Sequence, residues 1–371
     1  MYAARLAIFF FCLVAQVALG DLQATVESIV RSSNLGGGTA SVCVIDTQTG
    51  EVIAEMKSTS PMIPASNQKL LTTGAALHVL GPSFSFQTKL LQDGKNLIVV
   101  GDGDPTIGDT EFDGNIDWTR ESSMLVAELR PWVAAVKQSG LQHVDTLFID
   151  DRIFDRTYTH PSWPADQINN WYCAQVSGIN YHLNVVHFFP SPKSGTRASL
   201  GNFSPQLPWL TINNKTTSKT GKKDSSSFWV ARSPNSNNLT ARGNVNATHT
   251  VPVKVAIHDP SMIFGNTLAY ALQSEGISVN RIQRVGDFAP PSKGDVLYVR
   301  TTPLHDALLR SNRDSHNLYA EVLLKRIAAT ATGRPGTFDE GATVVEAAVS
   351  QRLASSQRLL NAADGSGMSR D

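Results

Sequence analysis

Ser66 and Lys69 are three residues apart at the start of an apolar run, in the stretch 64–70 that reads Pro-Ala-Ser-Asn-Gln-Lys-Leu. In a helix, positions i and i+3 share a face with Cβ atoms about 5–6 Å apart, so the Lys69 amine can reach the Ser66 hydroxyl. A hydroxyl beside a possible base is what a serine nucleophile needs. The spacing predicts acyl transfer through Ser66, although a bare Ser-x-x-Lys also occurs by chance and needs context.

The residues after Lys69 predict the helix that would hold this pair. Most apolar side chains of the run fall on one helical stripe, and the run ends at Gly-Pro, a common helix stop: Leu70, Leu71, Ala75, Leu77, Leu80, then Gly81 and Pro82. Ser66 would lie in the first turn. The positive end of the helix dipole favours an oxyanion there and helps to keep a neighbouring lysine neutral.

A second polar motif lies far downstream, on a predicted loop between helix-like segments 304–310 and 318–329. It reads Ser315-His316-Asn317. A Ser-x-Asn triplet accompanies Ser-x-x-Lys in penicillin-recognising enzymes. The alternative interpretation is that Ser315 and Asn317 only cap the helix that follows, since both residue types favour that position.

With the two motifs in this order, the chain resembles the low-molecular-mass class C penicillin-binding proteins, the secreted D-Ala-D-Ala carboxypeptidases and endopeptidases of the bacterial cell wall. The resemblance covers nearly all of the chain after residue 20. Besides 64–70 it includes Gly-Asp-Gly-Asp-Pro-Thr at 101–106, Ile-Asp-Asp-Arg-Ile-Phe at 149–154, Asn-Leu-Tyr-Ala-Glu at 317–321 and Asp-Gly-Ser-Gly at 364–367. The long separation of the two motifs argues against an ordinary β-lactamase.

The resemblance implies roles for four catalytic residues. Ser66 would attack the carbonyl between two terminal D-alanines, while neutral Lys69 takes its proton. Ser315 would relay a proton to the leaving D-alanine, and Asn317 would hold the peptide amide and orient Lys69. The implied partners are peptidoglycan peptides ending in D-Ala-D-Ala, with β-lactams as covalent inhibitors. The choice between carboxypeptidase and endopeptidase, and the oligomeric state, stay open.

The resemblance also implies an α/β (α+β) fold, with a β-lactamase/transpeptidase-like domain whose antiparallel sheet is flanked by helices. We expect this domain to comprise residues 21–92 and 251–371, and β-rich accessory domains to occupy residues 93–250. Between residues 194 and 250 the composition shifts towards Ser, Thr and Asn, which is typical of a loop-rich insertion.

The family carries a third motif, Lys-Thr-Gly, on a strand after Ser-x-Asn. The triplet Lys219-Thr220-Gly221 precedes Ser315 and lies in a polar tract without a strand pattern, so we interpret it as unrelated. The sequence reaches Asp371 without another such triplet, which predicts an incomplete chain that lacks the last strands of the sheet and is poorly active. Two alternatives remain: a non-catalytic remnant, or a β-lactamase or esterase that uses Ser66.

Residues 1–20 predict a secretory signal peptide, with Arg5 before an apolar core at 6–17 and small residues at 18–20. We therefore expect an exported, periplasmic or secreted protein with at most loose membrane association. Cys43 and Cys173 are expected to be two buried, unpaired cysteines.

The remaining features of the sequence exclude other functions. The 32 basic and 32 acidic residues balance, so nothing indicates nucleic-acid binding. No His or Cys cluster has the spacing of a zinc site, and we expect neither a metal nor a cofactor. Glu321 and Lys325, four residues apart, are predicted to form a solvated pair on the surface of a helix.

Overall fold

The computed structural model of the chain describes residues 22–112, 114, 117–194, 197–201, 203–205, 207, 210–218, 226–353 and 360–369. The chain forms two compact units, Met1–Pro64 and Ala65–Asp371. The predicted signal segment and the triplet Lys219-Thr220-Gly221 lie outside the described residues. Within the described part, no helix has both the length and the apolar character needed to cross a membrane.

The first unit holds a helix at residues 22–32 and a hairpin of β1 (Val42–Ile45) and β2 (Val52–Met56). Its turn is closed by Asp46, whose carboxylate accepts backbone N–H groups at 2.7 and 3.0 Å. Cys43 lies on β1 opposite Glu55 and is exposed, so the expectation that it is buried is wrong. A single hairpin has only one covered face, and Cys43 lies on the other. Cys173 is buried, and both cysteines are free, as predicted.

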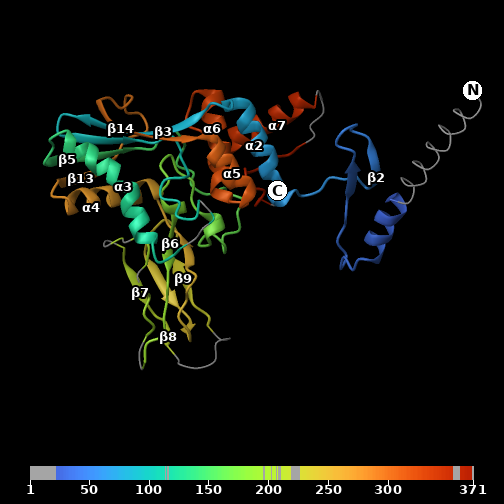
Figure 1. Cartoon of the computed structure of the whole chain (residues 1–371), viewed down its shortest axis with the longest axis horizontal. Coiled ribbons are helices and arrows are strands. Elements are labelled where there is room, and N and C mark those ends of the chain that lie inside the picture. Colours follow the sequence, from blue (N-terminus) through green and yellow to red (C-terminus); the bar gives the residue numbers. More distant parts are fainter. Residues whose placement is uncertain are drawn as a thin grey trace, which may run out of the picture. The chain divides into compact units, whose positions relative to one another are not determined.

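The second unit is built on a five-stranded sheet with the order β13-β5-β4-β3-β14 (Figure 1). Strand β3 pairs antiparallel with β4 and β14, while β5 runs parallel to β4 and β13. The predicted domain boundary at residue 92 falls inside β3, and strands from both sides of it share this sheet. The division into a transpeptidase-like domain and inserted domains stays a prediction. The strands are β3 (Ser85–Asp93), β4 (Asn96–Val100), β5 (His143–Asp150), β13 (Ser278–Arg284) and β14 (Asp295–Pro303).

Two helices, α3 (Glu121–Gln138) and α4 (Pro260–Ser274), cover one face of this sheet (Figure 1). The Trp132 side chain on α3 is fully buried, and its ring meets Phe264 and Tyr298 edge-on at centroid distances of 5.3 and 5.0 Å. The helix α4 begins at Pro260, where the Asp259 carboxylate caps it by accepting a backbone N–H from its first turn. The core of the sheet therefore depends on close helix packing.

Four further helices pack together: α2 (Gln68–Leu80), α5 (Leu304–Arg313), α6 (Asn317–Thr332) and α7 (Phe338–Arg352). The central helix α6 is covered by the other three, so the predicted solvated pair of Glu321 and Lys325 is wrong. Both side chains are fully buried. Lys325 pairs with Asp155 and donates to the carbonyl of Thr157 at 2.9 Å. These contacts offset the free-energy cost of burying its charge.

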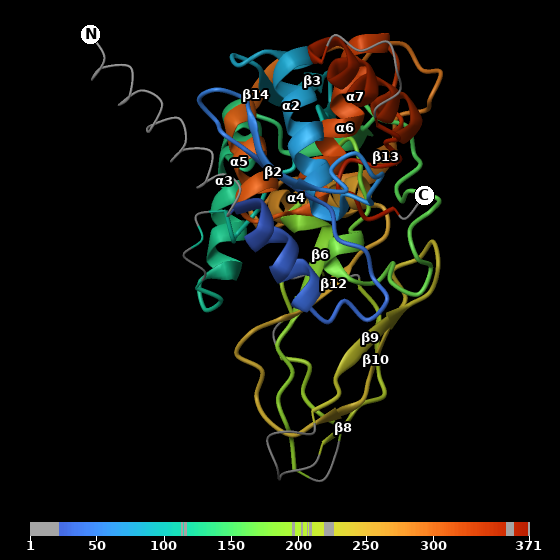
Figure 2. The ribbon, with the colours of Figure 1, turned by 90° about the vertical axis from the view of Figure 1, so that its right-hand side faces the viewer.

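The segment between β5 and α4 in the sequence forms three small sheets around an apolar core of their own (Figure 2). One pairs β6 with β12 antiparallel, one has the order β7-β10-β9, and one pairs β8 with β11. This part is rich in strands, as the sequence predicts. The strands are β6 (Val185–Phe188), β7 (Ile212–Asn214), β8 (Thr217–Ser218), β9 (Trp229–Arg232), β10 (Leu239–Arg242), β11 (Asn244–Val245) and β12 (Val253–Ala256).

We expect Trp132→Ala to destabilise the protein by about 3–5 kcal/mol, because it removes a large, fully buried side chain and leaves a cavity between α3 and the sheet. Urea unfolding gives the value. Val126→Ala, on an exposed position of the same helix, is the matched control and is expected to change stability by less than about 0.5 kcal/mol. Equal effects in the two variants would contradict this account of the core.

Candidate active site

The structure brings Ser66 and Lys69 together as the sequence predicts. Ser66 lies in the single 3₁₀ turn Ala65–Asn67 that leads into α2, and its side chain is exposed. Lys69 lies in the first turn of α2 and is only 2% exposed. Its Nζ is 3.1 Å from Ser66 Oγ, which is hydrogen-bond distance. An accessible hydroxyl therefore lies beside a buried amine at the start of a helix.

The surroundings of Lys69 favour the neutral amine. Burial lowers the pKa of Lys69, although the nearby acidic groups Glu321 and Asp364 act in the opposite direction. The same Nζ donates to the backbone carbonyl of Ser366 at 3.0 Å. An amine that spends one N–H on this carbonyl can direct its lone pair at the Ser66 hydroxyl. The geometry thus suits Lys69 for accepting the Ser66 proton.

The carbonyl that binds Lys69 belongs to a turn at residues 364–367, which is held by Glu321. The Glu321 carboxylate accepts the backbone N–H of Gly365 at 2.8 Å and that of Ser366 at 2.9 Å. From α2, the Thr72 hydroxyl donates to the carbonyl of Gly365 at 2.8 Å. Sequence reasoning placed this segment in the family resemblance but gave it no function, because a Gly-rich turn carries no local sign of chemistry.

The turn also lies directly against the residue before the nucleophile. A Cβ added to Gly367 would be 1.8 Å from the carbonyl oxygen of Ala65, and Gly367 has a φ of +74°. Asp364 stabilises the turn internally by accepting the N–H of Gly367 at 2.7 Å, and it accepts the indole N–H of Trp163 at 2.8 Å. Only glycine fits position 367 in this arrangement.

The second motif lies at the start of α6. Ser315 is exposed and has a φ of +53°, while Asn317 is the first residue of the helix. The Asn317 amide donates to the carbonyl of Tyr172 at 2.9 Å and lies 3.8 Å from Met368 Sδ. Its hydrogen bonds therefore go to Tyr172 and to the segment that follows the 364–367 turn. The roles assigned to Ser315 and Asn317 stay predictions.

Between these two residues, His316 is buried against Trp171 and Tyr319. Burial lowers the pKa of His316 to about 3, and the positive charge of Arg310 contributes.

A buried ion pair stabilises the loop of the second motif. The Arg310 guanidinium binds Asp109 at 2.9 Å, and the hydroxyl of Tyr319 donates to the same carboxylate at 2.6 Å. Burial alone would raise the pKa of Asp109, but Arg310 and the hydrogen bonds lower it overall. A buried charge of this kind is tolerated because it is paired and hydrogen-bonded.

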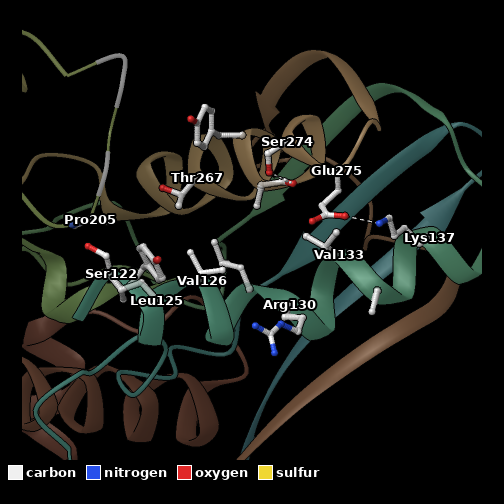
Figure 3. Close-up of a pocket in the computed structure, with 15 residues that line it drawn as sticks. Ser122, Leu125, Val126, Arg130, Val133, Lys137, Pro205, Thr267, Ser274 and Glu275 are labelled. Carbon is white, nitrogen blue, oxygen red and sulfur yellow. Dashed lines mark hydrogen bonds and ion pairs between the residues drawn. The ribbon is translucent and has the colours of Figure 1, made fainter. Parts of the chain in front are cut away.

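A cavity of about 500 Å³ lies elsewhere, between α3 and α4 (Figure 3). Its walls include Leu125, Val126 and Thr267, and an ion pair between Lys137 and Glu275 closes one side. None of the four predicted catalytic residues lines it. The cavity is therefore separate from the predicted catalytic residues.

We expect Glu321 to lower the free energy of unfolding as the pH rises from about 6.5 to 8, above the range in which the lowered pKa of His316 has the opposite effect. Burial and the charge of Asp364 raise the pKa of Glu321 from 4.5 to about 8. Between these values the folded state binds a proton that the unfolded state has released, so the free energy of unfolding decreases by up to about 1.4 kcal/mol per pH unit. Urea unfolding at several pH values measures this slope.

Glu321→Gln should flatten that slope, because the amide does not titrate. Glu51→Gln, at an exposed position, is the control and should leave the slope unchanged. A slope that is the same in the wild type and in Glu321→Gln would show that Glu321 is ionised throughout this pH range.

Comparison with known proteins places this chain in a family. The model of the D-Ala-D-Ala carboxypeptidase 3 (S13) family matches residues 22–371. The chain is 28% identical over 373 residues to a D-alanyl-D-alanine carboxypeptidase of Actinomadura sp. (strain R39), covering 95% of this chain and 65% of that protein. It is 23% identical over 328 residues to D-alanyl-D-alanine carboxypeptidase DacB of Haemophilus influenzae, covering 86% of this chain and 65% of that protein. This chain thus spans about two thirds of the length of these relatives.

Solved structures confirm the predicted fold class. The crystal structure of penicillin binding protein 4 (dacB) from Haemophilus influenzae matches with a TM-score of 0.72 at 22% identity, covering 90% of this chain and 71% of that one. The same protein in complex with a novel β-lactam matches with a TM-score of 0.66. With a family match over nearly its whole length, this chain belongs to the D-Ala-D-Ala carboxypeptidase 3 (S13) family.

Proposed function

We propose that this chain is a serine-type D-Ala-D-Ala carboxypeptidase that acts on peptidoglycan stem peptides through an acyl-enzyme on Ser66. The observation that carries the proposal is the 3.1 Å contact between the exposed Ser66 hydroxyl and the buried amine of Lys69. Membership of the S13 family supports the substrate class. The same acyl chemistry serves an endopeptidase, which differs only in the amine that leaves.

In the first step, Ser66 Oγ attacks the carbonyl carbon between the two terminal D-alanines, and Lys69 takes the hydroxyl proton. The negative charge that develops on the carbonyl oxygen lies near the N-terminus of α2, where the helix dipole and free N–H groups stabilise it. Lys69 carries the proton only transiently, because its burial favours the neutral amine. Ser66 therefore becomes a nucleophile without a histidine.

In the second step, the C–N bond breaks and the terminal D-alanine leaves with the proton, which Ser315 relays. Asn317 contacts the peptide amide of the substrate. Water then attacks the ester on Ser66, Lys69 takes a proton from this water, and Ser66 regains its hydroxyl hydrogen. The net reaction consumes one water molecule and releases D-alanine. Export to the periplasm or cell exterior, where peptidoglycan lies, is part of the proposal.

Labelling with a fluorescent penicillin tests this proposal. We expect a stable covalent adduct, located on Ser66 by peptide mass spectrometry, and release of D-alanine from a peptide ending in D-Ala-D-Ala. Ser66→Ala should abolish both, while Ser123→Ala, at an exposed serine on α3, should change neither. Absence of an adduct in the folded protein would overturn the proposal in favour of a non-catalytic protein, and rapid loss of the adduct would indicate a β-lactamase.

We expect Gly367→Ala to slow penicillin acylation at least about tenfold, because its Cβ would push the 364–367 turn away from Ala65 and with it the carbonyl that binds Lys69. Gly333→Ala is the matched control, since Gly333 has a similar φ of +66° but open space around its Cβ position. It should cost about 1 kcal/mol of stability and leave acylation unchanged. Equal acylation rates in the two variants would show that the turn does not position Lys69.

A further inference from the structure

A second group of reactive side chains lies away from Ser66, where α3 meets β6. Glu121 is the first residue of α3, His182 lies in the turn His182–Asn184, and His187 lies on β6. All three are buried, with exposed fractions of 2%, 0% and 0%. One ligand atom from each lies within 4.8 Å of the others. Two imidazoles and a carboxylate form a common ligand set for zinc and related ions.

The hydrogen bonds of His182 present its Nε2 as a ligand. Its Nδ1 is 2.9 Å from the backbone carbonyl of Val185, and its Nε2 is 3.1 Å from Glu121 Oε1. Histidines that bind metals usually donate their other ring N–H to a carbonyl or carboxylate in this way. With the proton on Nδ1, the Nε2 lone pair faces a negative carboxylate oxygen, and a cation between the two removes that repulsion.

Two atoms of the group have no hydrogen-bond partner within the described part of the chain, namely Glu121 Oε2 and His187 Nε2. Three groups crowd Oε1 instead, namely His182 Nε2 at 3.1 Å, His187 Nδ1 at 2.6 Å and the Thr110 hydroxyl, which donates at 3.0 Å. Buried polar atoms are almost always paired. A bound cation would engage the unused carboxylate oxygen, so this pattern points to a missing positive charge.

The backbone that carries His182 is held in an uncommon conformation. Residues 182–184 have φ values of +51°, +55° and +56°, a left-handed region that non-glycine residues rarely adopt. The Asn184 side chain fixes this turn, since it accepts the N–H of Tyr181 at 2.9 Å and donates to Gln175 and Asn180. Backbone strain of this kind is concentrated at functional sites. The position of His182 is therefore set before any ligand binds.

We propose that Glu121, His182 and His187 bind a divalent ion of the zinc class, which joins the start of α3 to β6. Ligand atoms around a tetrahedral ion with bonds of about 2.0–2.1 Å are about 3.3 Å apart, so the His182 contact fits and the His187 contact must lengthen. The Trp118 ring packs edge-on against His187, and Glu111, 3.8 Å from His187 Nε2, is paired with Lys254. These groups close the site on that side.

The test uses the full chain without a polyhistidine tag, stripped of metal with a chelator and titrated with Co²⁺ and Zn²⁺. We expect stoichiometric binding, the visible absorption of tetrahedral Co²⁺, and a higher melting temperature with metal. Glu121→Gln and His182→Asn should each weaken binding at least about 100-fold, more than the loss typical of an outer partner of a ligand. Asparagine tolerates the left-handed backbone at position 182.

His305→Gln, at a side chain that is 76% exposed, is the control and should bind like the wild type. Penicillin labelling of Ser66 and circular dichroism show whether each variant is folded, and Glu121→Gln, which keeps the shape of the side chain, serves if His182→Asn does not fold. A folded wild-type chain without a tetrahedral Co²⁺ spectrum or a metal-dependent melting temperature would overturn the proposal, as would variants that bind with wild-type affinity. Either result would identify the group as a buried His–Glu–His hydrogen-bond network.

Discussion

The candidate active site depends on one interaction, in which a buried carboxylate accepts two backbone hydrogen bonds from a turn. Glu321, at the centre of α6, holds two successive backbone N–H groups of the 364–367 turn, and this turn offers its carbonyl to Lys69 on α2. The amine and its acceptor are 297 residues apart in the sequence. The proposed base for Ser66 is therefore positioned by packing between helices and not by the Ser-x-x-Lys tetrad alone.

Two buried ion pairs lie near this site. Lys325, one helical turn from Glu321 on α6, pairs with Asp155. Arg310, on the helix that precedes the second motif, pairs with Asp109. Such pairs add little net stability, but removing one partner leaves an uncompensated charge that costs about 3–5 kcal/mol. They tie α5 and α6, which pack against α2, to the segments that carry Asp109 and Asp155.

The parts of this protein that the sequence predicts are those governed by local rules. The contact of Ser66 with Lys69 follows from helix geometry, and the start of α4 follows from the cap at Asp259. The role of Glu321 does not, because its partners lie 44 and 45 residues away on a turn without a pattern. On sequence alone, a charged residue four positions from a lysine is a surface pair, and only the covering helices reverse that interpretation.

The spacing of residues along the sequence likewise does not reveal the group formed by Glu121, His182 and His187. Glu121 is 61 residues from His182, so no short motif contains both. The sequence also does not predict helix α7, because its run of alanine and other small residues has little apolar periodicity. The strand β13 has two apolar residues among polar and charged ones, so its sequence carries no strand pattern, although it pairs in register with β5.

The turn that lies against Ala65 comes far later in the sequence than Lys69, and this separation has a consequence for the chain while it is being synthesised. Protein synthesis proceeds at about 5–20 residues per second, so roughly 15–60 s separate the appearance of Lys69 from that of its acceptor on residue 366. During that interval α2 has nothing to cover the amine, which stays hydrated and protonated, and Ser66 remains an ordinary serine. The nascent chain thus carries the proposed nucleophile without its buried base until the 364–367 turn has been translated.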